Sequence, residues 1–179
     1  MHMSDTREIQ AEPAAVYAAL LDPEVLRICV SGAQEVTGNP TDGYQATVVQ
    51  KVGPVKATFK GTVTMSDMVE NERLTIVGEG KGGAAGFAKG GASVTLSPSE
   101  NGGTLLSYDV DAKVGGKLAQ LGSRLIDGFA KKMADQFFAS LQEHLEGPAE
   151  EEPEAEAAES DEETAEKKKG WLGRLTGRG

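Results

Sequence analysis

The stretch KLAQLGSRLIDGFAKKMADQFFASLQEHL (residues 117–145) decides the fold, because it has the period of a helix in a chain that is otherwise patterned as strands. Apolar side chains recur every three to four residues along it, which places them on one face of an α-helix. A helix of this length spans about 43 Å, enough to cross a β-sheet. We therefore predict one long amphipathic helix, with an apolar stripe of Leu118, Leu121, Leu125, Phe129, Met133, Phe137 and Leu141.

Most of the chain before this helix has a period of two residues. The clearest segment is 55–65, in which apolar or small residues alternate with lysine and threonine. Such alternation predicts a strand with one buried face and one face in water. Residues 13–30 predict two short helices, which Asp22-Pro23 separates. Further strands are predicted at 4–10, 33–38, 43–52, 74–80, 91–97 and 104–114.

This order of one strand, two helices, six strands and a long helix predicts an α+β helix-grip fold, a curved antiparallel β-sheet wrapped around the long C-terminal helix. A concave apolar face that pairs with a single helix often encloses a cavity. Small residues such as Gly61, Gly78 and Ala92 would leave part of that face unfilled. Packing of helix on sheet without a void is the alternative. If a cavity forms, we expect a ligand to contact Phe59, Val63, Ile76, Tyr108, Val110, Leu121, Leu125, Phe129 and Met133, which are otherwise ordinary core residues.

The densest glycine run is GEGKGGAAGFAKGG, residues 78–91. It contains the letters GxGxxG, but both flanks are predicted strands, whereas a dinucleotide fingerprint opens a helix. A phosphate-binding P-loop would need serine or threonine after Lys81, and the next residue is Gly82. We therefore expect no phosphate here. The run predicts a mobile apolar hairpin loop for contact or gating, made of Gly83, Ala84, Ala85, Gly86, Phe87, Ala88 and Lys89.

Composition divides the chain into three parts. Residues 1–146 form the predicted domain, with 18 acidic and 13 basic residues. Residues 147–166 contain ten carboxylates and no basic or aromatic residue, which predicts a disordered acidic linker. Residues 167–179 carry five basic residues and the only tryptophan. An acidic body argues against nucleic acid as the main partner.

The last thirteen residues predict a basic amphipathic tail that binds a membrane surface. In a helical projection Trp171, Leu172 and Leu175 fall within about 100° of one another. Each basic residue near an anionic leaflet contributes about 1 kcal/mol, so the anchoring would be reversible. A plain solubilising tail is the alternative. The residues expected at the membrane are Lys167, Lys168, Lys169, Trp171, Leu172, Arg174, Leu175 and Arg178.

The sequence does not favour an enzyme or a metal protein. Cys29 is the only cysteine, and His2 and His144 are the only histidines, so no Ser-His-Asp, Cys-His or metal-ligand set is apparent. His2 is expected in a disordered start, and Asp109 and Asp111 on the wet face of one strand. We expect no signal peptide and no membrane span, and hence a cytoplasmic protein held at the inner face of the cell membrane.

Three segments together resemble a known family. They are KVGPVKATFKG (51–61), GEGKGGAAGFAKG (78–90) and YDVDAKVGGKLAQLGSRLIDGFAKKMADQFF (108–138). In this order they closely resemble the G-subunit family of carbon monoxide dehydrogenase, within the START/Bet v 1-like helix-grip superfamily. One departure is Val30-Ser31-Gly32, where such proteins usually carry Ile-Pro-Gly. Loss of that proline affects the expected rigidity of the turn and not the fold.

The resemblance implies an accessory protein of aerobic carbon monoxide dehydrogenase, or of a related molybdenum hydroxylase, that brings the enzyme to the cytoplasmic membrane. Together with the expected cavity and tail, it suggests a carrier of lipid or isoprenoid quinone (menaquinone or ubiquinone) that supports electron transfer to the quinone pool. No covalent or metal cofactor is expected. A ligand-free tethering adaptor or maturation factor for the same enzyme is the alternative, and a helix-grip cyclase or hydrolase is less favoured.

Overall fold

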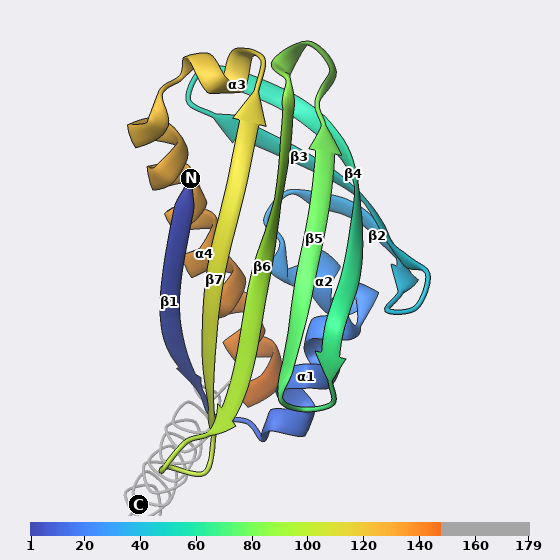
Figure 1. Ribbon diagram of the computed structural model, residues 1–179, viewed down its shortest axis with the longest axis vertical. Coiled ribbons are helices and arrows are strands. Elements are labelled where there is room, and N and C mark those ends of the chain that lie inside the picture. Colours follow the sequence, from blue (N-terminus) through green and yellow to red (C-terminus); the bar gives the residue numbers. More distant parts are fainter. Residues whose placement is uncertain (148–179) are drawn as a thin grey trace, which may run out of the picture. The chain divides into compact units, whose positions relative to one another are not determined.

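The computed structural model describes residues 1–147, which contain one seven-stranded antiparallel β-sheet. The strand order across the sheet is β1-β7-β6-β5-β4-β3-β2 (Figure 1). From β2 to β7, strands that follow one another in the sequence are also neighbours in the sheet. The first strand, β1, pairs instead with the last, β7. The predicted linker and tail lie outside the described residues. The strands are β1 (His2–Ile9), β2 (Ala33–Asn39), β3 (Gly43–Val52), β4 (Val55–Val69), β5 (Arg73–Lys81), β6 (Phe87–Pro98) and β7 (Thr104–Gly115).

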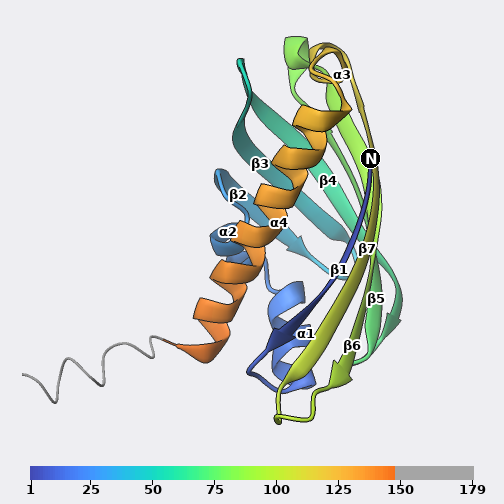
Figure 2. The same cartoon turned by 90° about the vertical axis from the view of Figure 1, so that its left-hand side faces the viewer.

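The helices all lie on the concave side of this sheet (Figure 2). The short helices α1 (Pro13–Leu21) and α2 (Pro23–Cys29) follow β1, and each begins with proline, whose fixed φ suits the first helical position. The Asp22 carboxylate accepts a hydrogen bond from the backbone N–H of Glu24 at 2.9 Å and so caps α2. The fold is therefore the predicted α+β sheet gripping a long C-terminal helix.

The prediction of one unbroken helix over 117–145 was wrong. A short helix α3 (Lys117–Gln120) is followed by the long helix α4 (Ser123–Glu146). Gly122, with φ of +89°, lies between them in a conformation that L side chains rarely adopt and that commonly ends a helix. The break also resets the helical face. Ile126 is 8% exposed and faces the sheet, whereas Leu125 of the predicted stripe is 40% exposed.

The predicted mobile loop at residues 83–89 is shorter than expected. Only residues 82–86 leave the sheet, with Gly83–Ala85 forming the 3₁₀ turn η1, because β6 already begins at Phe87 and pairs with both β5 and β7. Ala85 is 6% exposed, so it packs inward and is not presented to solvent. Ala84 and Phe87 remain exposed at the tip.

The main core lies at the end of the sheet that α1 and α2 cover. Its most buried side chains come from β1, α1, β5, β7 and α4 (Ile9, Val16, Leu74, Leu106 and Leu141). The only cysteine, Cys29, is buried in the same cluster, and burial raises the pKa of its thiol. A second, smaller cluster of Val52, Leu118 and Ile126 fills the opposite end. Between these two clusters the concave face is less completely covered.

Tyr44 joins the helices to the sheet. It is almost fully buried on β3, and its hydroxyl donates a hydrogen bond to the carbonyl oxygen of Leu21 at 2.5 Å. Burial raises the pKa of this phenol, with a further contribution from the nearby charge of Asp22. The bond satisfies a carbonyl at the C-terminal end of α1, which has no partner within the helix.

We predict that Tyr44→Phe lowers the free energy of unfolding by about 1 kcal/mol, because the Leu21 carbonyl then loses its donor in a buried place. Denaturant titration followed by circular dichroism measures this difference. Tyr17→Phe is the matched control, since the hydroxyl of Tyr17 has no hydrogen-bond partner in the part of the chain that the structure describes. Equal stability losses in the two variants would contradict a specific role for the Tyr44 bond.

Candidate functional site, an apolar cavity beneath the long helix

An apolar cavity of about 310 Å³ lies between the concave face of the sheet and the helices. Its volume is at the lower end of the range for small-molecule sites. The lining is almost wholly hydrocarbon, and its polar side-chain groups are two phenol hydroxyls. The lining residues are Met3, Leu20, Leu26, Val30, Val36, Tyr44, Ala46, Val63, Met65, Ile76, Ala92, Val94, Leu106, Tyr108, Val110, Ala134, Phe137 and Phe138.

Small residues leave this space open. On the inner face Gly61 pairs opposite Gly80, and Gly78 pairs opposite Gly90. A Cβ added at Gly78 would lie 3.5 Å from a methyl group of Val63, which is ordinary contact, so the strand would accept a larger residue there. These glycines and neighbouring alanines floor an open groove of about 380 Å³. The groove shares Ile76, Ala92 and Val110 with the cavity and is therefore continuous with it.

The structure brings together some of the nine residues predicted to contact a ligand. Val63, Ile76, Tyr108 and Val110 line the cavity. Phe59 lines the groove. Strand alternation identified these five, because every second residue of β4, β5 and β7 faces inward. Their role in binding stays a prediction.

The four helix residues of that set lie elsewhere. Leu121 and Phe129 pack in the smaller core cluster beside α3, and Met133 is half-buried outside the lining. Leu125 lies on the exposed side of α4, with its side chain against Gly53 in the turn between β3 and β4. The helix break at Gly122 explains the displacement, since the helical face used for the prediction assumed a continuous helix.

Sequence reasoning missed the contribution of α1, α2 and β3 to the lining. Leu20 and Leu26 come from the two short helices, and Tyr44 and Ala46 from β3. The alternation within 43–52 already indicated that Tyr44 and Ala46 share a face. No local signal in the sequence indicates that α1 and α2 line the same cavity. Their place depends on how the segment between β1 and β2 crosses the concave face of the sheet.

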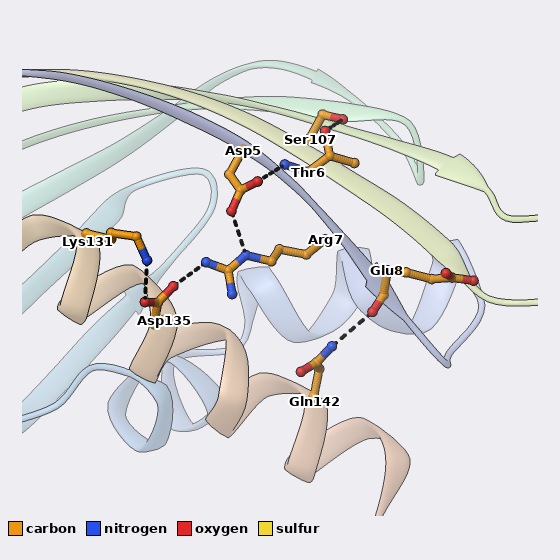
Figure 3. A network of polar contacts seen from close by, with 8 residues as sticks. All are labelled: Asp5, Thr6, Arg7, Glu8, Ser107, Lys131, Asp135 and Gln142. Atoms are coloured by element: carbon orange, nitrogen blue, oxygen red, sulfur yellow. Dashed lines mark hydrogen bonds and ion pairs between the residues drawn. The ribbon is translucent and has the colours of Figure 1, made fainter.

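A polar network joins β1 to α4 beside the cavity (Figure 3). Arg7 donates from Nη2 to Asp135 and from Nε to Asp5 at 3.1 Å. Lys131 Nζ contacts the other oxygen of Asp135 at 3.0 Å. The Arg7 guanidinium also lies 5.2 Å from the ring centroid of Phe138, which stacks on Tyr108 at 5.1 Å. The Arg7 charge therefore lies over the ring of Phe138, which in turn stacks on Tyr108, and both rings line the cavity.

The pairing shifts the ionisation of both partners. The hydrogen bond from Arg7, and then that from Lys131, lowers the pKa of the Asp135 carboxyl below its usual range. The pKa of Arg7 is raised chiefly by Asp135 and further by the Tyr108 hydroxyl, against the opposing effect of desolvation. Asp135 and Arg7 are therefore both charged at neutral pH, and neither is poised as an acid or base near pH 7.

The tip of the β5–β6 hairpin packs on two aromatic rings. The ring of Phe59 lies against Gly82, where a side chain would overlap it. The ring of Phe87 lies against Gly115 at the end of β7 and is 38% exposed. The predicted contact loop is thus a short turn braced by glycines, and its contact role stays a prediction.

His2 does not lie in a disordered start, as the sequence suggested. It belongs to β1 and pairs opposite Asp111. Its ring nitrogens lie 3.5 Å from a carboxylate oxygen of Asp109 and 3.6 Å from one of Asp111, and all three side chains are exposed on the outer face. His2 has a defined place because β1 is hydrogen-bonded to β7 along its length. The N-terminal amine also donates to the carbonyl oxygen of Ala112 at 2.9 Å.

A bent antiparallel sheet that grips one long helix over an apolar cavity defines the helix-grip class, to which START and Bet v 1-like proteins belong. Within that class the chain belongs to the CoxG family, the G-subunit family of carbon monoxide dehydrogenase, which matches it over residues 6–146. The resemblance inferred from the three sequence segments is confirmed. No curated protein matches this sequence.

Solved structures show the same fold. A conserved protein from Geobacillus kaustophilus is 26% identical, with a TM-score of 0.76 over 81% of this chain and 95% of its own. A START superfamily protein from Mycobacterium smegmatis is 16% identical, with a TM-score of 0.60 over 81% of this chain and 97% of its own. A protein from Rhizobium leguminosarum is 19% identical, with a TM-score of 0.60 over 83% of this chain and 95% of its own. At such identities the last two show the fold alone.

We predict that Asp135→Asn lowers the melting temperature at neutral pH and that this difference shrinks in acid. The folded-state pKa of Asp135 is depressed, so its stabilising effect is complete above the pKa of an unfolded aspartate, about 3.9, and is lost as the pH falls through the folded-state value. Thermal unfolding from neutral pH to the acid limit of folding measures this. Asp127→Asn, on the same helix and without an ion pair in the described residues, is the control. A difference that stays constant to the acid limit would contradict the assignment.

Proposed function

We propose that this protein is an accessory subunit of aerobic carbon monoxide dehydrogenase, or of a related molybdenum hydroxylase, that carries a lipid or isoprenoid quinone in its apolar cavity at the cytoplasmic membrane. Membership of the CoxG family suggests the enzyme partner. The single observation that supports the cargo is the hydrocarbon lining of the 310 Å³ cavity. An empty apolar space of this size sacrifices packing energy, which a bound apolar molecule would restore.

The polar groups near the cavity favour a ligand with a long apolar part and a small head. The Tyr44 hydroxyl already donates to Leu21, so it is engaged. The Tyr108 hydroxyl lies beside Arg7, which supplies a donor at the edge of the lining. A quinone carbonyl, or the ester of a lipid, would match that corner. The continuous groove would take the part of an isoprenoid chain that a cavity of this size leaves outside.

This cargo would fit the needs of the partner enzyme. A long isoprenoid quinone does not cross water unaided, because its exposed apolar surface is costly. An oxidoreductase outside the bilayer therefore needs a carrier, or a docking device, to reduce it. A protein that shields the quinone and contacts both membrane and enzyme would supply electron transfer to the quinone pool without chemistry of its own.

Membrane recruitment would use parts of the chain outside the described residues. The acidic linker at 147–166 would span about 25 Å as a flexible chain and more with self-repulsion. The basic tail at 167–179 would bind the anionic leaflet at the inner face of the cell membrane. Among the described residues, no helix combines the length and apolar content that crossing a bilayer requires.

A ligand-free tethering adaptor, or a maturation factor, for the same enzyme is the second candidate. It would use the same tail and hairpin tip but would leave the cavity empty. The observation that favours it is the moderate volume of the cavity, which the α4 side chains Phe137 and Phe138 already narrow. A helix-grip hydrolase or cyclase is less favoured, because the polar side chains near the cavity form a paired ionic network.

We predict that full-length protein, incubated with vesicles containing isoprenoid quinone and repurified, yields quinone on organic extraction and mass spectrometry. Ala92→Leu should lower that yield at least about fivefold, because the larger side chain occupies the space that a ligand needs. Ser93→Leu is the matched control, since it makes a similar change at the next residue, on the outer face of β6.

The control must keep the wild-type quinone content, and both variants must unfold cooperatively. An equal loss in the two variants would place the lipid outside the cavity. Absence of any lipid in the wild-type extract would reject the carrier and leave the adaptor as the better account.

A further inference from the structure

Lysines gather on the outer face of the sheet at the end that carries η1 and α3. Successive residues of a strand point to opposite faces, so the residues next to the groove-lining Phe59, Gly80 and Ala88 project outward. Those residues are Lys60, Lys81 and Lys89. The complete lysine face comprises these three with Lys51, Lys56 and Lys113, all of them exposed.

The lysine face is arranged as three like-charged pairs. Lys51 lies opposite Lys56, Lys60 opposite Lys81, and Lys89 opposite Lys113 in the strand registers. Like charges directly across a strand pair are destabilising, because their Cβ atoms are close. None of the six lysines forms a salt bridge within residues 1–147. The fold thus carries an electrostatic cost at these pairs that no salt bridge among the described residues relieves.

The charge is also segregated along the body. Of the 13 basic residues before residue 147, eight lie at this end: the lysine face with Lys117 and Arg124. Acidic residues outnumber basic ones over the same body, 18 to 13, yet the acids near this end are Glu35, Glu79, Asp111 and Asp127. Glu79 lies opposite Lys89 and offsets part of the charge. The end with η1 and α3 therefore carries more basic than acidic residues on a body that is acidic as a whole.

We propose that the lysine face docks on the surface of an anionic phospholipid bilayer, independently of the basic tail. The inference deepens the proposed function and rests on it, because it assigns the body a membrane contact of its own beside that of the tail. A bilayer presents diffuse charge over a broad surface, which point-charged lysines suit, whereas ordered carboxylate or phosphate recognition favours arginine. All the basic residues on the outer face of the sheet at this end are lysines.

Exposed apolar side chains at the same end match this partner. Phe87 at the hairpin tip and Leu125 beside the β3–β4 turn are 38% and 40% exposed. Phe87 pairs opposite Lys81, and an exposed aromatic side chain beside lysines is typical of an interfacial membrane contact. The groove lies on the inner side of the same strands, so docking this end would place the groove near the lipid surface, on the side of the sheet away from the lysine face.

Vesicle binding by the full-length chain tests the proposal once the tail is neutralised. In a background with glutamine at Lys167, Lys168, Lys169, Arg174 and Arg178, partition onto phosphatidylglycerol–phosphatidylcholine vesicles should remain measurable and should fall with added salt. Adding K60Q, K81Q, K89Q and K113Q should lower it at least about tenfold, since each lysine near the surface contributes about fivefold before screening. Phosphatidylcholine vesicles alone should bind neither protein.

The matched control lowers the net charge by the same four units elsewhere, with R27Q, R73Q, K132Q and S97E in the same background. It should retain most of the vesicle binding, while the lysine-face variant should unfold at an unchanged or higher temperature because like-charge repulsion is relieved. Equal losses in the two variants, or retained binding by the lysine-face variant, would overturn the proposal. Unchanged vesicle binding with lost affinity for the partner enzyme would assign the face to that protein instead.

Fluorescence separates docking from nonspecific attraction. With Trp171→Phe as background, Phe87→Trp should shift its emission to the blue on anionic vesicles, and Leu105→Trp, at the opposite end of the outer face, should not. A shift at Leu105→Trp alone would reject this orientation. Neither measurement requires a ligand in the cavity, so the docking surface can fail while quinone extraction succeeds, and the reverse.

Discussion

The fold depends on covering the concave face of a strongly bent antiparallel sheet with a single helix. Seven strands present more inner surface than α4 can bury, and the chain meets this constraint in two ways. Large side chains from α1, α2 and α4 fill the end around Leu74, Leu106 and Leu141. Toward the hairpin tips, glycine and alanine replace large side chains, so the strands remain bonded while the space above them stays open. The cavity lies where the filled core meets the open, glycine-rich part of the inner face.

The same constraint separates the two faces of the sheet into different chemical roles. The inner face near the tip is apolar and nearly free of side-chain bulk, and the outer face of the same strands carries repelling lysines. Because successive residues of a strand point to opposite faces, Phe59 faces the apolar groove while its neighbour Lys60 faces solvent. At the other end, the half-buried Arg7 packs over Phe138 and is balanced by Asp5 and Asp135, so charge there serves the packing of β1 on α4.

Periodicity was sufficient to predict the seven strands, the helix order and the gripping helix, because each signal is local. The prediction of β3 at 43–52 matches the structure at both ends. The errors came from nonlocal or single-residue effects. Gly122 ends one helix and shifts the buried face of the next from Leu125 to Ile126, a change of one position that alternation cannot reveal. Leu20 and Leu26 line the cavity because the chain folds back across the sheet after β1, which no local pattern predicts. The like-charged lysine pairs depend on the strand register, which sequence alone does not give.

The pairing of the first strand with the last has a consequence for how the protein is made. The hydroxyls of Thr6 and Ser107 meet at 3.0 Å although 101 residues separate them. The strands β2 to β7 can form as successive hairpins, but β1 has no place in the sheet until β7 has been synthesised. Contacts of such long sequence separation slow folding, because a large loop must close before they are gained. During synthesis on the ribosome β1 therefore has no strand partner, and its addition to the sheet is a late step of folding.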